Sequence, residues 1–152
     1  MTPPHASPLI RPARADDDTA LAALARHLGY PADAAAMSAR MARIRADDGY
    51  ATFVAEVEGR VVGFAGAMWQ WSYVDDARRS QLLALVVDPA ERGRGTGAAL
   101  VAAAEEWARG KGAGGIYLTT RMHRVDAHRF YERIGYQRTG YRYLKSFGGG
   151  TH

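Results

Sequence analysis

The segment with the most chemical content is a glycine-rich turn at residues 88–98, which follows an apolar run, Leu82 to Val87. Glycine lets a backbone adopt positive φ and approach a ligand closely. The turn opens a segment with helical spacing, and the free N–H groups of a helix N-terminus favour an anion. Arg92 and Arg94 add positive charge and guanidinium donors. The turn is therefore predicted to bind phosphate.

Three kinds of phosphate loop can be compared with this turn. A Walker loop ends in Gly-Lys-Ser/Thr, which the turn lacks. A dinucleotide fingerprint is formally present as Gly93, Gly95 and Ala98, but the next strand ends at residues 118–121 without the acid that holds a ribose. The acyl-CoA loop, Arg/Gln-x-x-Gly-x-Gly/Ala, is matched completely by residues 92–97. We favour acyl-CoA as the ligand, and the alternative is a loop that only turns the chain.

Two more segments complete a known pattern. Residues 59–63 end a predicted hairpin, and residues 127–136 are similar to an Ala-x-x-Phe-Tyr-Glu-x-x-Gly-Phe helix. Together with the strand and the loop, they resemble the GNAT family of N-acetyltransferases over residues 10–136. The family often has Asn three residues before the Ala of that helix. This chain has Arg124 there, which we interpret as the mark of a subgroup.

The resemblance implies an acetyl-CoA-dependent N-acetyltransferase that acetylates a primary amine by direct attack in a ternary complex. Acetyl-CoA would be the cosubstrate, and no metal is implied. The backbone of the strand would pair with the pantetheine arm, and the loop would bind the pyrophosphate. Tyr131 would be the general acid for the departing thiolate, although it could also be an ordinary packed aromatic. The implied cofactor-binding residues are Leu85, Val86, Val87, Arg92, Gly93, Arg94, Gly95, Thr96 and Gly97.

The general base is left open. Many relatives carry a glutamate on the strand before the loop, but residues 81–85 contain no acid. Glu56, Asp75 and Asp76 are alternatives, and so are a water chain or an amine that arrives neutral.

The acceptor amine has several candidate contacts. Trp69, Trp71 and Tyr73 alternate, so they share one face of a strand. They could pack under a helix, or they could form an aromatic wall that binds a cationic amine. The same site would include Asp75, Asp76 and Tyr30, the last of which lies between the first two predicted helices, where relatives line the acceptor site.

A folded domain must position these residues. The hydrophobic periodicity of the sequence predicts one α/β domain over residues 1–152, of the α+β kind with a mixed sheet and helices on its faces. Residues 1–8 and 148–152 are expected to be flexible ends. The predicted order is β-α-α-β-β-β-α-β-α-β-β. In that order the elements are strand 8–12, helices 16–29 and 31–46, strands 52–57, 60–71 and 82–87, helix 95–109, strand 116–120, helix 126–134, and strands 136–138 and 141–146.

Composition narrows the function further. The chain has no cysteine, which removes disulfides, thiolate metal sites and a thiol nucleophile, and His123 and His128 lack a third metal ligand nearby. No apolar run is long enough to span a bilayer and no signal peptide is recognised, so a cytoplasmic protein without a membrane partner is expected. The net charge of +4 is small and dispersed, which disfavours a nucleic-acid partner. The alternatives are a CoA-binding module without turnover and a nucleic-acid binder. The resemblance to the family suggests a homodimer. The expected acceptor is a small-molecule or peptide amine.

Overall fold

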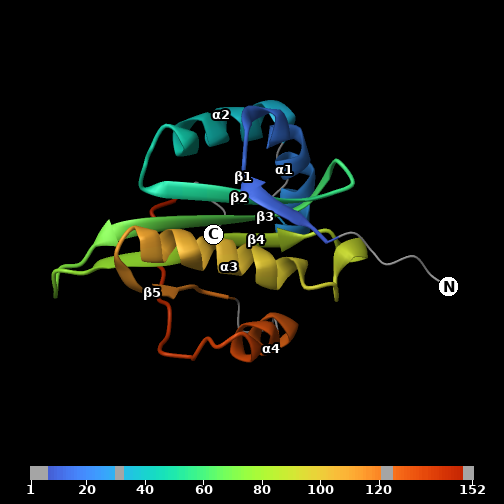
Figure 1. Ribbon diagram of the computed structural model, residues 1–152. Coiled ribbons are helices and arrows are strands. Elements are labelled where there is room, and N and C mark those ends of the chain that lie inside the picture. The colour runs from blue at the N-terminus through green and yellow to red at the C-terminus, as the bar shows by residue number, and fades with distance from the viewer. Residues whose placement is uncertain (1–6, 30–32, 121–124, 149–152) are drawn as a thin grey trace. The chain divides into compact units, whose positions relative to one another are not determined.

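The computed structural model describes residues 7–29, 33–120 and 125–148 (Figure 1). The chain forms two compact units, residues 1–118 and residues 119–152. Tyr30, His123 and Arg124 lie outside the described residues.

The first unit is built on a five-stranded sheet in the order β1-β2-β3-β4-β5. β1 to β4 pair antiparallel in succession, and β4 pairs parallel with β5. The mixed α+β fold class is therefore confirmed. The strands are β1 (Leu9–Pro12), β2 (Tyr50–Val57), β3 (Arg60–Trp71), β4 (Arg78–Val87) and β5 (Ala113–Tyr117).

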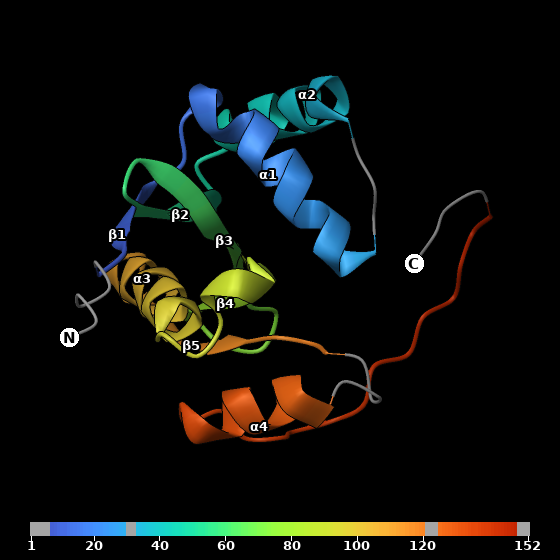
Figure 2. The same ribbon diagram turned by 90° about the vertical axis from the view of Figure 1, so that its right-hand side faces the viewer.

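Helices cover both faces of this sheet. α1 (Asp18–Ala25) and α2 (Ala34–Arg45) lie over one face, and α3 (Thr96–Gly110) lies over the other (Figures 1 and 2). Leucines and methionines of α1 and α2 are buried against β2, β3 and β4, and each contributes about 1.5–3 kcal/mol through burial. The buried residues of α3 on the other face are Thr96, Leu100, Val101, Ala104 and Ala108.

Local signals set several element ends, and α2 begins at Ala34 rather than at the predicted residue 31. Gly29 has φ +83° and ends the helical segment that begins at Asp18. The Asp33 carboxylate accepts a hydrogen bond from the backbone N–H of Ala36 at 2.7 Å and so caps α2. Glu58 and Gly59 both have positive φ, as in the type I′ turn of a two-residue hairpin, so the predicted β2–β3 hairpin is confirmed.

The ends of two strands differ from the prediction. β4 begins at Arg78 rather than at residue 82, because its antiparallel pairing with β3 continues to Trp71↔Arg78. β5 spans Ala113–Tyr117 rather than 116–120, because its parallel partner is the first part of β4. Strand ends depend on pairing with the neighbouring strand, which for β5 lies more than 30 residues away in the sequence.

The second unit contains one helix among its described residues, α4 (Val125–Arg133), followed by Gly135 with φ +101°. The strands predicted at 136–138 and 141–146 are wrong, because residues 136–148 form neither helix nor strand. Alternating residues form a strand only beside another strand, and none accompanies this segment in its described unit. The rings of Tyr141 and Tyr143 are 87% and 93% exposed.

An ion-pair cluster joins the N-terminal elements. Asp17 is 6% exposed at its side chain and accepts two hydrogen bonds from Arg11, at 2.8 and 2.9 Å. Arg11 also contacts Glu56 at 3.3 Å, and Arg45 pairs with Asp18 at 2.8 Å. The bonds from Arg11, and then the backbone N–H of Arg14, lower the pKa of Asp17 below its ordinary value of 3.8.

We therefore expect Asp17→Asn to lower the free energy of unfolding at pH 7 by about 3 kcal/mol, as for a buried pair that loses one partner. Because the pKa of folded Asp17 is depressed, its contribution is fully present above 3.8 and is lost as the pH falls through the lower folded value. Urea unfolding at pH 7 and near pH 2 measures both effects. The exposed Asp16→Asn is the control, and an equal deficit for Asp17→Asn at both pH values would contradict the linkage.

Candidate cofactor and acceptor site

The phosphate loop is the segment between the end of β4 and the start of α3. Gly93 and Gly95 have φ of +81° and +79°, and Gly95 is the N-cap of α3. No heavy atom lies within 4 Å of a Cβ built on either glycine, so the backbone angle rather than packing favours glycine there. The backbone N–H of Asp88 donates to the Val62 carbonyl at 2.8 Å and anchors the loop to β3. The loop therefore leaves the N-terminus of α3 approachable, as phosphate binding requires.

The charged side chains of the loop are arranged unequally. Arg92 is exposed, and its side chain makes no hydrogen bond or ion pair with any residue that the structure describes. Arg94 donates to the carboxylate of Glu91 at 3.0 Å, and Arg60 contacts the same carboxylate at 3.5 Å. Two guanidinium groups thus contact one carboxylate, and with the exposed Arg92 the three arginines leave this region with a net positive charge.

β4 has a free edge beside this loop. β5 pairs with β4 only as far as Gln81↔Tyr117, so in the described chain Leu82 to Val87 pair with β3 alone. Gly66 faces Ala84 and Ala67 faces Leu82, which leaves Leu83 as an extra residue that bends β4. The predicted pantetheine-binding residues Leu85, Val86 and Val87 lie on this edge. Their strand can therefore offer backbone hydrogen bonds to an extended ligand.

The aromatic residues of β3 lie at the opposite end of the sheet. Trp69 and Trp71 share a face as predicted, with ring centroids 5.4 Å apart in an edge-to-face arrangement. The Arg78 guanidinium lies 4.3 Å from the Trp69 ring centroid and 4.6 Å from that of Trp71. It also donates to the carbonyl of Lys111 at 3.1 Å, at the end of α3. A cation of the chain itself therefore already contacts both rings.

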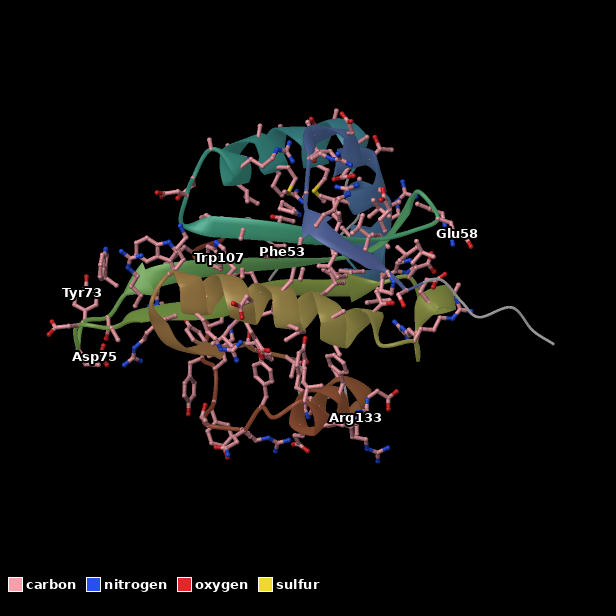
Figure 3. The ribbon with its side chains drawn as sticks, viewed as in Figure 1. Phe53, Glu58, Tyr73, Asp75, Trp107 and Arg133 are labelled. Carbon is pink, nitrogen blue, oxygen red and sulfur yellow. The ribbon has the colours of Figure 1, made fainter. Side chains whose placement is uncertain are left out.

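The other acceptor candidates lie on the β3–β4 hairpin. Tyr73 and Asp75 are at its tip, and Glu58 marks the β2–β3 turn at the other end of the sheet (Figure 3). Tyr73 and Asp76 are exposed. Asp75 accepts a hydrogen bond from the Ala77 N–H at 3.0 Å and contacts Arg79 at 3.5 Å. The structure thus groups Tyr73, Asp75 and Asp76 on one exposed hairpin.

Sequence reasoning missed a polar pair where β4 and β5 separate. The Gln70 amide donates to the Tyr117 hydroxyl at 3.2 Å. By alternation, Gln70 lies on the face of β3 opposite Trp69 and Trp71. The only sequence signal was a polar residue inside an aromatic strand, Trp69-Gln70-Trp71, and nothing local identified Tyr117 as its partner.

Glu56, one of the possible general bases, lies on β2, two strands away from β4. Its carboxylate is engaged with Arg11. Among the described residues no group of three or more His, Asp or Glu side chains is placed to hold a metal ion, and no helix is long and apolar enough to cross a membrane.

Tyr131 lies on α4 of the second unit and is half-buried there. Its ring makes edge-to-face contacts with Phe130 and Tyr136, at centroid distances of 5.2 and 5.7 Å. The Tyr136 N–H donates to the Tyr131 carbonyl at 2.9 Å. These contacts fix the ring within its own unit.

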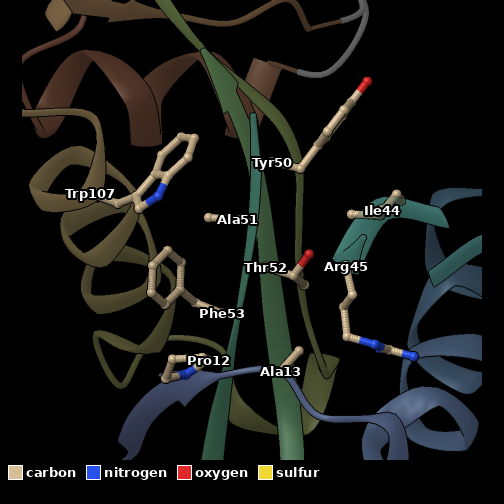
Figure 4. Close-up of a pocket in the computed structure, with 9 residues that line it drawn as sticks. All are labelled: Pro12, Ala13, Ile44, Arg45, Tyr50, Ala51, Thr52, Phe53 and Trp107. Carbon is tan, nitrogen blue, oxygen red and sulfur yellow. The ribbon is translucent and has the colours of Figure 1, made fainter. Parts of the chain in front are cut away.

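A surface hollow of about 340 Å³ lies elsewhere, around β2 beyond the end of β1 (Figure 4). Phe53 and Trp107 lie on one side of β2, and Ile44 and Arg45 lie on the other. None of the predicted site residues lines it.

Known proteins are similar to this chain in sequence and in fold. An aminoglycoside N(6')-acetyltransferase type 1 of Stenotrophomonas maltophilia is 32% identical over 137 residues, which cover 88% of each chain. An aminoalkylphosphonate N-acetyltransferase of Salmonella typhimurium is 40% identical over 88 residues, covering 58% of this chain and 57% of the relative. In the first relatives matched, the aligned segment spans only 39 to 57% of the relative's length.

A solved structure supports the fold. The aminoglycoside N-acetyltransferase AAC(6')-Iy in complex with CoA superimposes with a TM-score of 0.84 at 24% identity, covering 96% of this chain and 98% of that chain. Residues 16–136, which include the phosphate loop and α4, match the family described as "Acetyltransferase (GNAT) family". The chain therefore belongs to the acetyltransferase (GNAT) family.

Proposed function

We propose that this protein is an acetyl-CoA-dependent N-acetyltransferase that transfers the acetyl group directly to a primary amine in a ternary complex. The carrying observation is the phosphate loop, residues 92–97, at the end of the free β4 edge. A relative that covers 88% of this chain is named an N-acetyltransferase, and a protein of the same fold was solved with CoA.

The length of the free edge suits the pantetheine arm. The arm has about twelve bonds from its phosphate-ester oxygen to sulfur, the length of about four residues of backbone, or roughly 13–14 Å. Leu82 to Val87 extend over roughly 17 Å at the usual rise of a strand. With the diphosphate at the loop, an arm paired along this edge places sulfur near the Leu83 bulge. The thioester then lies just before the point where β4 and β5 separate.

The reaction needs four contributions: a bound cofactor, a neutral amine, a donor for the developing oxyanion and a proton for the thiolate. In this proposal backbone N–H groups of β4 bind the arm and polarise the thioester, and those of residues 93–97 bind the diphosphate. Tyr131 donates the proton to the thiolate. The neutral amine, which has already lost the ammonium proton to solvent, attacks the carbonyl carbon and the C–S bond breaks. The amine nitrogen then loses a second proton to water, and Tyr131 regains its proton from solvent. Glu56 is disfavoured as the base by its ion pair with Arg11.

The acceptor is proposed to be a polar or cationic amine. The exposed hairpin with Tyr73, Asp75 and Asp76 offers an aromatic ring and two carboxylates. Trp69 and Trp71 already hold Arg78, so their role here is to fix the base of that hairpin. A relative's name refers to aminoglycosides, which are polyamines, and this supports the charge of the proposed acceptor. Tyr30 is kept as a further acceptor contact.

We expect Asp75→Asn combined with Asp76→Asn to raise KM for the amine by about five- to thirtyfold. Two exposed carboxylates contribute at most about 0.5–1 kcal/mol each toward a cation, and 1.4 kcal/mol is a factor of ten. KM for acetyl-CoA should stay unchanged. Steady-state kinetics with each substrate varied in turn measures both constants.

The matched control is Asp16→Asn combined with Asp48→Asn, which removes the same charge from exposed positions outside the hairpin. Equal KM values for the amine in wild type and in the Asp75/Asp76 variant would place the acceptor site elsewhere.

A turnover assay tests the proposed function. Purified protein with acetyl-CoA and a panel of polyamines, aminoglycosides, amino acids and peptides should release CoA and form an acetylated amine. Binding of acetyl-CoA without release of CoA would support a CoA-binding module without turnover. Release of CoA without an acetylated amine would instead mean hydrolysis, and it would contradict transfer to the amines of the panel.

Two expectations accompany this proposal, a homodimer and a cytoplasmic location. The exposed rings of Tyr141, Tyr143 and Phe147 support a partner surface on the second unit, since large exposed aromatic rings are enriched at interfaces.

A further inference from the structure

Glu91 is a buried carboxylate inside a loop built for an anion. The residue is only 6% exposed. Its Oε2 accepts a hydrogen bond from Arg94 Nη1 at 3.0 Å, and its Oε1 lies 3.5 Å from Arg60 Nη2. The proposed acetyltransferase chemistry assigns it no task.

A carboxylate at this place has two costs. Removing a charge from water costs several kcal/mol unless partners compensate for it. A negative charge next to a phosphate site also opposes phosphate binding. The contacts that this carboxylate makes must therefore compensate for both costs.

Glu91 holds two separate pieces of backbone together. Arg94 lies three residues further along the same loop, between Gly93 and Gly95, which both have positive φ. Arg60 directly follows the two-residue turn of the β2–β3 hairpin, whose geometry fixes where its side chain starts. The Asp88 N–H to Val62 carbonyl bond ties the same two segments together from the backbone side. The carboxylate thus connects the loop segment that holds the two positive-φ glycines to the β2–β3 hairpin.

The two arginines of the loop consequently differ. The Arg94 side chain is 38% exposed and directed to Glu91. Arg92 is exposed, and its guanidinium makes no hydrogen bond or ion pair within the described residues. We infer that Glu91 is a positioning residue of the phosphate loop, acting through Arg94 and Arg60, and that Arg92 supplies the guanidinium that meets the diphosphate. Arg94 then contributes its backbone N–H to the ligand, while its side chain maintains the loop. This inference rests on the proposed acetyl-CoA function.

A double-mutant cycle tests the assignment. We expect Glu91→Gln and Arg94→Ala each to weaken acetyl-CoA binding about tenfold, and the double variant to be no weaker than either single one, because both break the same brace. The matched cycle uses Glu91→Gln with Arg92→Ala, where two independent losses should multiply to about 100-fold. Arg60→Ala should cost about threefold, since its contact is longer and its side chain is 68% exposed. Calorimetry gives each Kd, and thermal unfolding checks that each variant is folded.

Salt dependence provides a second measurement that needs no change at the buried position. Arg92→Gln should reduce the slope of log Kd against log salt, because a free cation that meets phosphate is lost. Arg94→Gln should weaken binding with an unchanged slope, because Glu91 already neutralises its charge. In both arginine variants, KM for the amine should remain at the wild-type value.

Multiplying effects of Glu91→Gln and Arg94→Ala, or a reduced slope for Arg94→Gln, would overturn the positioning role while leaving acetyl-CoA as the cosubstrate. A wild-type protein that does not bind acetyl-CoA would instead overturn the proposed function, and this inference with it.

Discussion

Gly95→Glu is expected to weaken acetyl-CoA binding by at least about 100-fold. Gly95 has φ +79°, where a residue with a Cβ is strained by roughly 1–2 kcal/mol. The position is open, so the new side chain causes no clash that would prevent folding. Its carboxylate projects at the N-terminus of α3, where the diphosphate must approach the free N–H groups. Like charges at this short distance add to the strain, and calorimetry measures the loss.

Two controls separate the causes. Gly95→Ala introduces the strain without the charge, and it should weaken binding no more than about tenfold. Gly112→Glu places the same side chain at an open position with φ +82° after α3, and it should lower stability without changing acetyl-CoA affinity. Wild-type affinity in Gly95→Glu would show that the phosphate loop is not the cofactor site.

Tyr131→Phe is expected to lower the single-turnover rate by roughly 100-fold. A phenol has an ordinary pKa of about 10, so it carries a proton to donate at neutral pH. A departing thiolate can accept that proton. The loss corresponds to about 2.7 kcal/mol of transition-state stabilisation. Acetyl-CoA affinity should change little, because the ring and its contacts with Phe130 and Tyr136 are kept.

Single-turnover measurement matters because product release can hide a change in the chemical step. Tyr136→Phe removes a hydroxyl from the neighbouring ring and serves as the control. If Tyr131→Phe reacts at the wild-type rate, the tyrosine only packs on α4, and the thiolate takes its proton from water or from the incoming ammonium.

The features that were predictable from sequence carry their signal locally. Glycines at 93 and 95 indicate positive φ angles. The two-residue Glu58-Gly59 turn, between segments of alternating apolar and polar residues, predicts a hairpin. The ends of β4 and β5 were not predictable, because they depend on how far pairing with the neighbouring strand continues, and for β5 that strand lies far away in the sequence. Apolar and polar residues alternate at 136–146 as they do in a strand, but no strand lies beside the described residues of this segment. The predicted strands therefore do not form.

In the candidate site, too, local patterns were predictable from the sequence and contacts between distant residues were not. Alternation placed Trp69 and Trp71 on one face, but only the fold brings Arg78 between them and the end of α3. Glu91 reads in sequence as one more solvated charge beside arginines. In the structure it is buried, and one of its two partners is Arg60, which is 31 residues away.

Calorimetric titration of the wild-type protein tests the central claim most directly. We expect one acetyl-CoA to bind per chain with a Kd of about micromolar order, and we expect no comparable affinity for NAD or ATP. The reason is that the loop of residues 92–97 does not completely match either a dinucleotide site or a Walker site. Tight binding of NAD without binding of acetyl-CoA would contradict it.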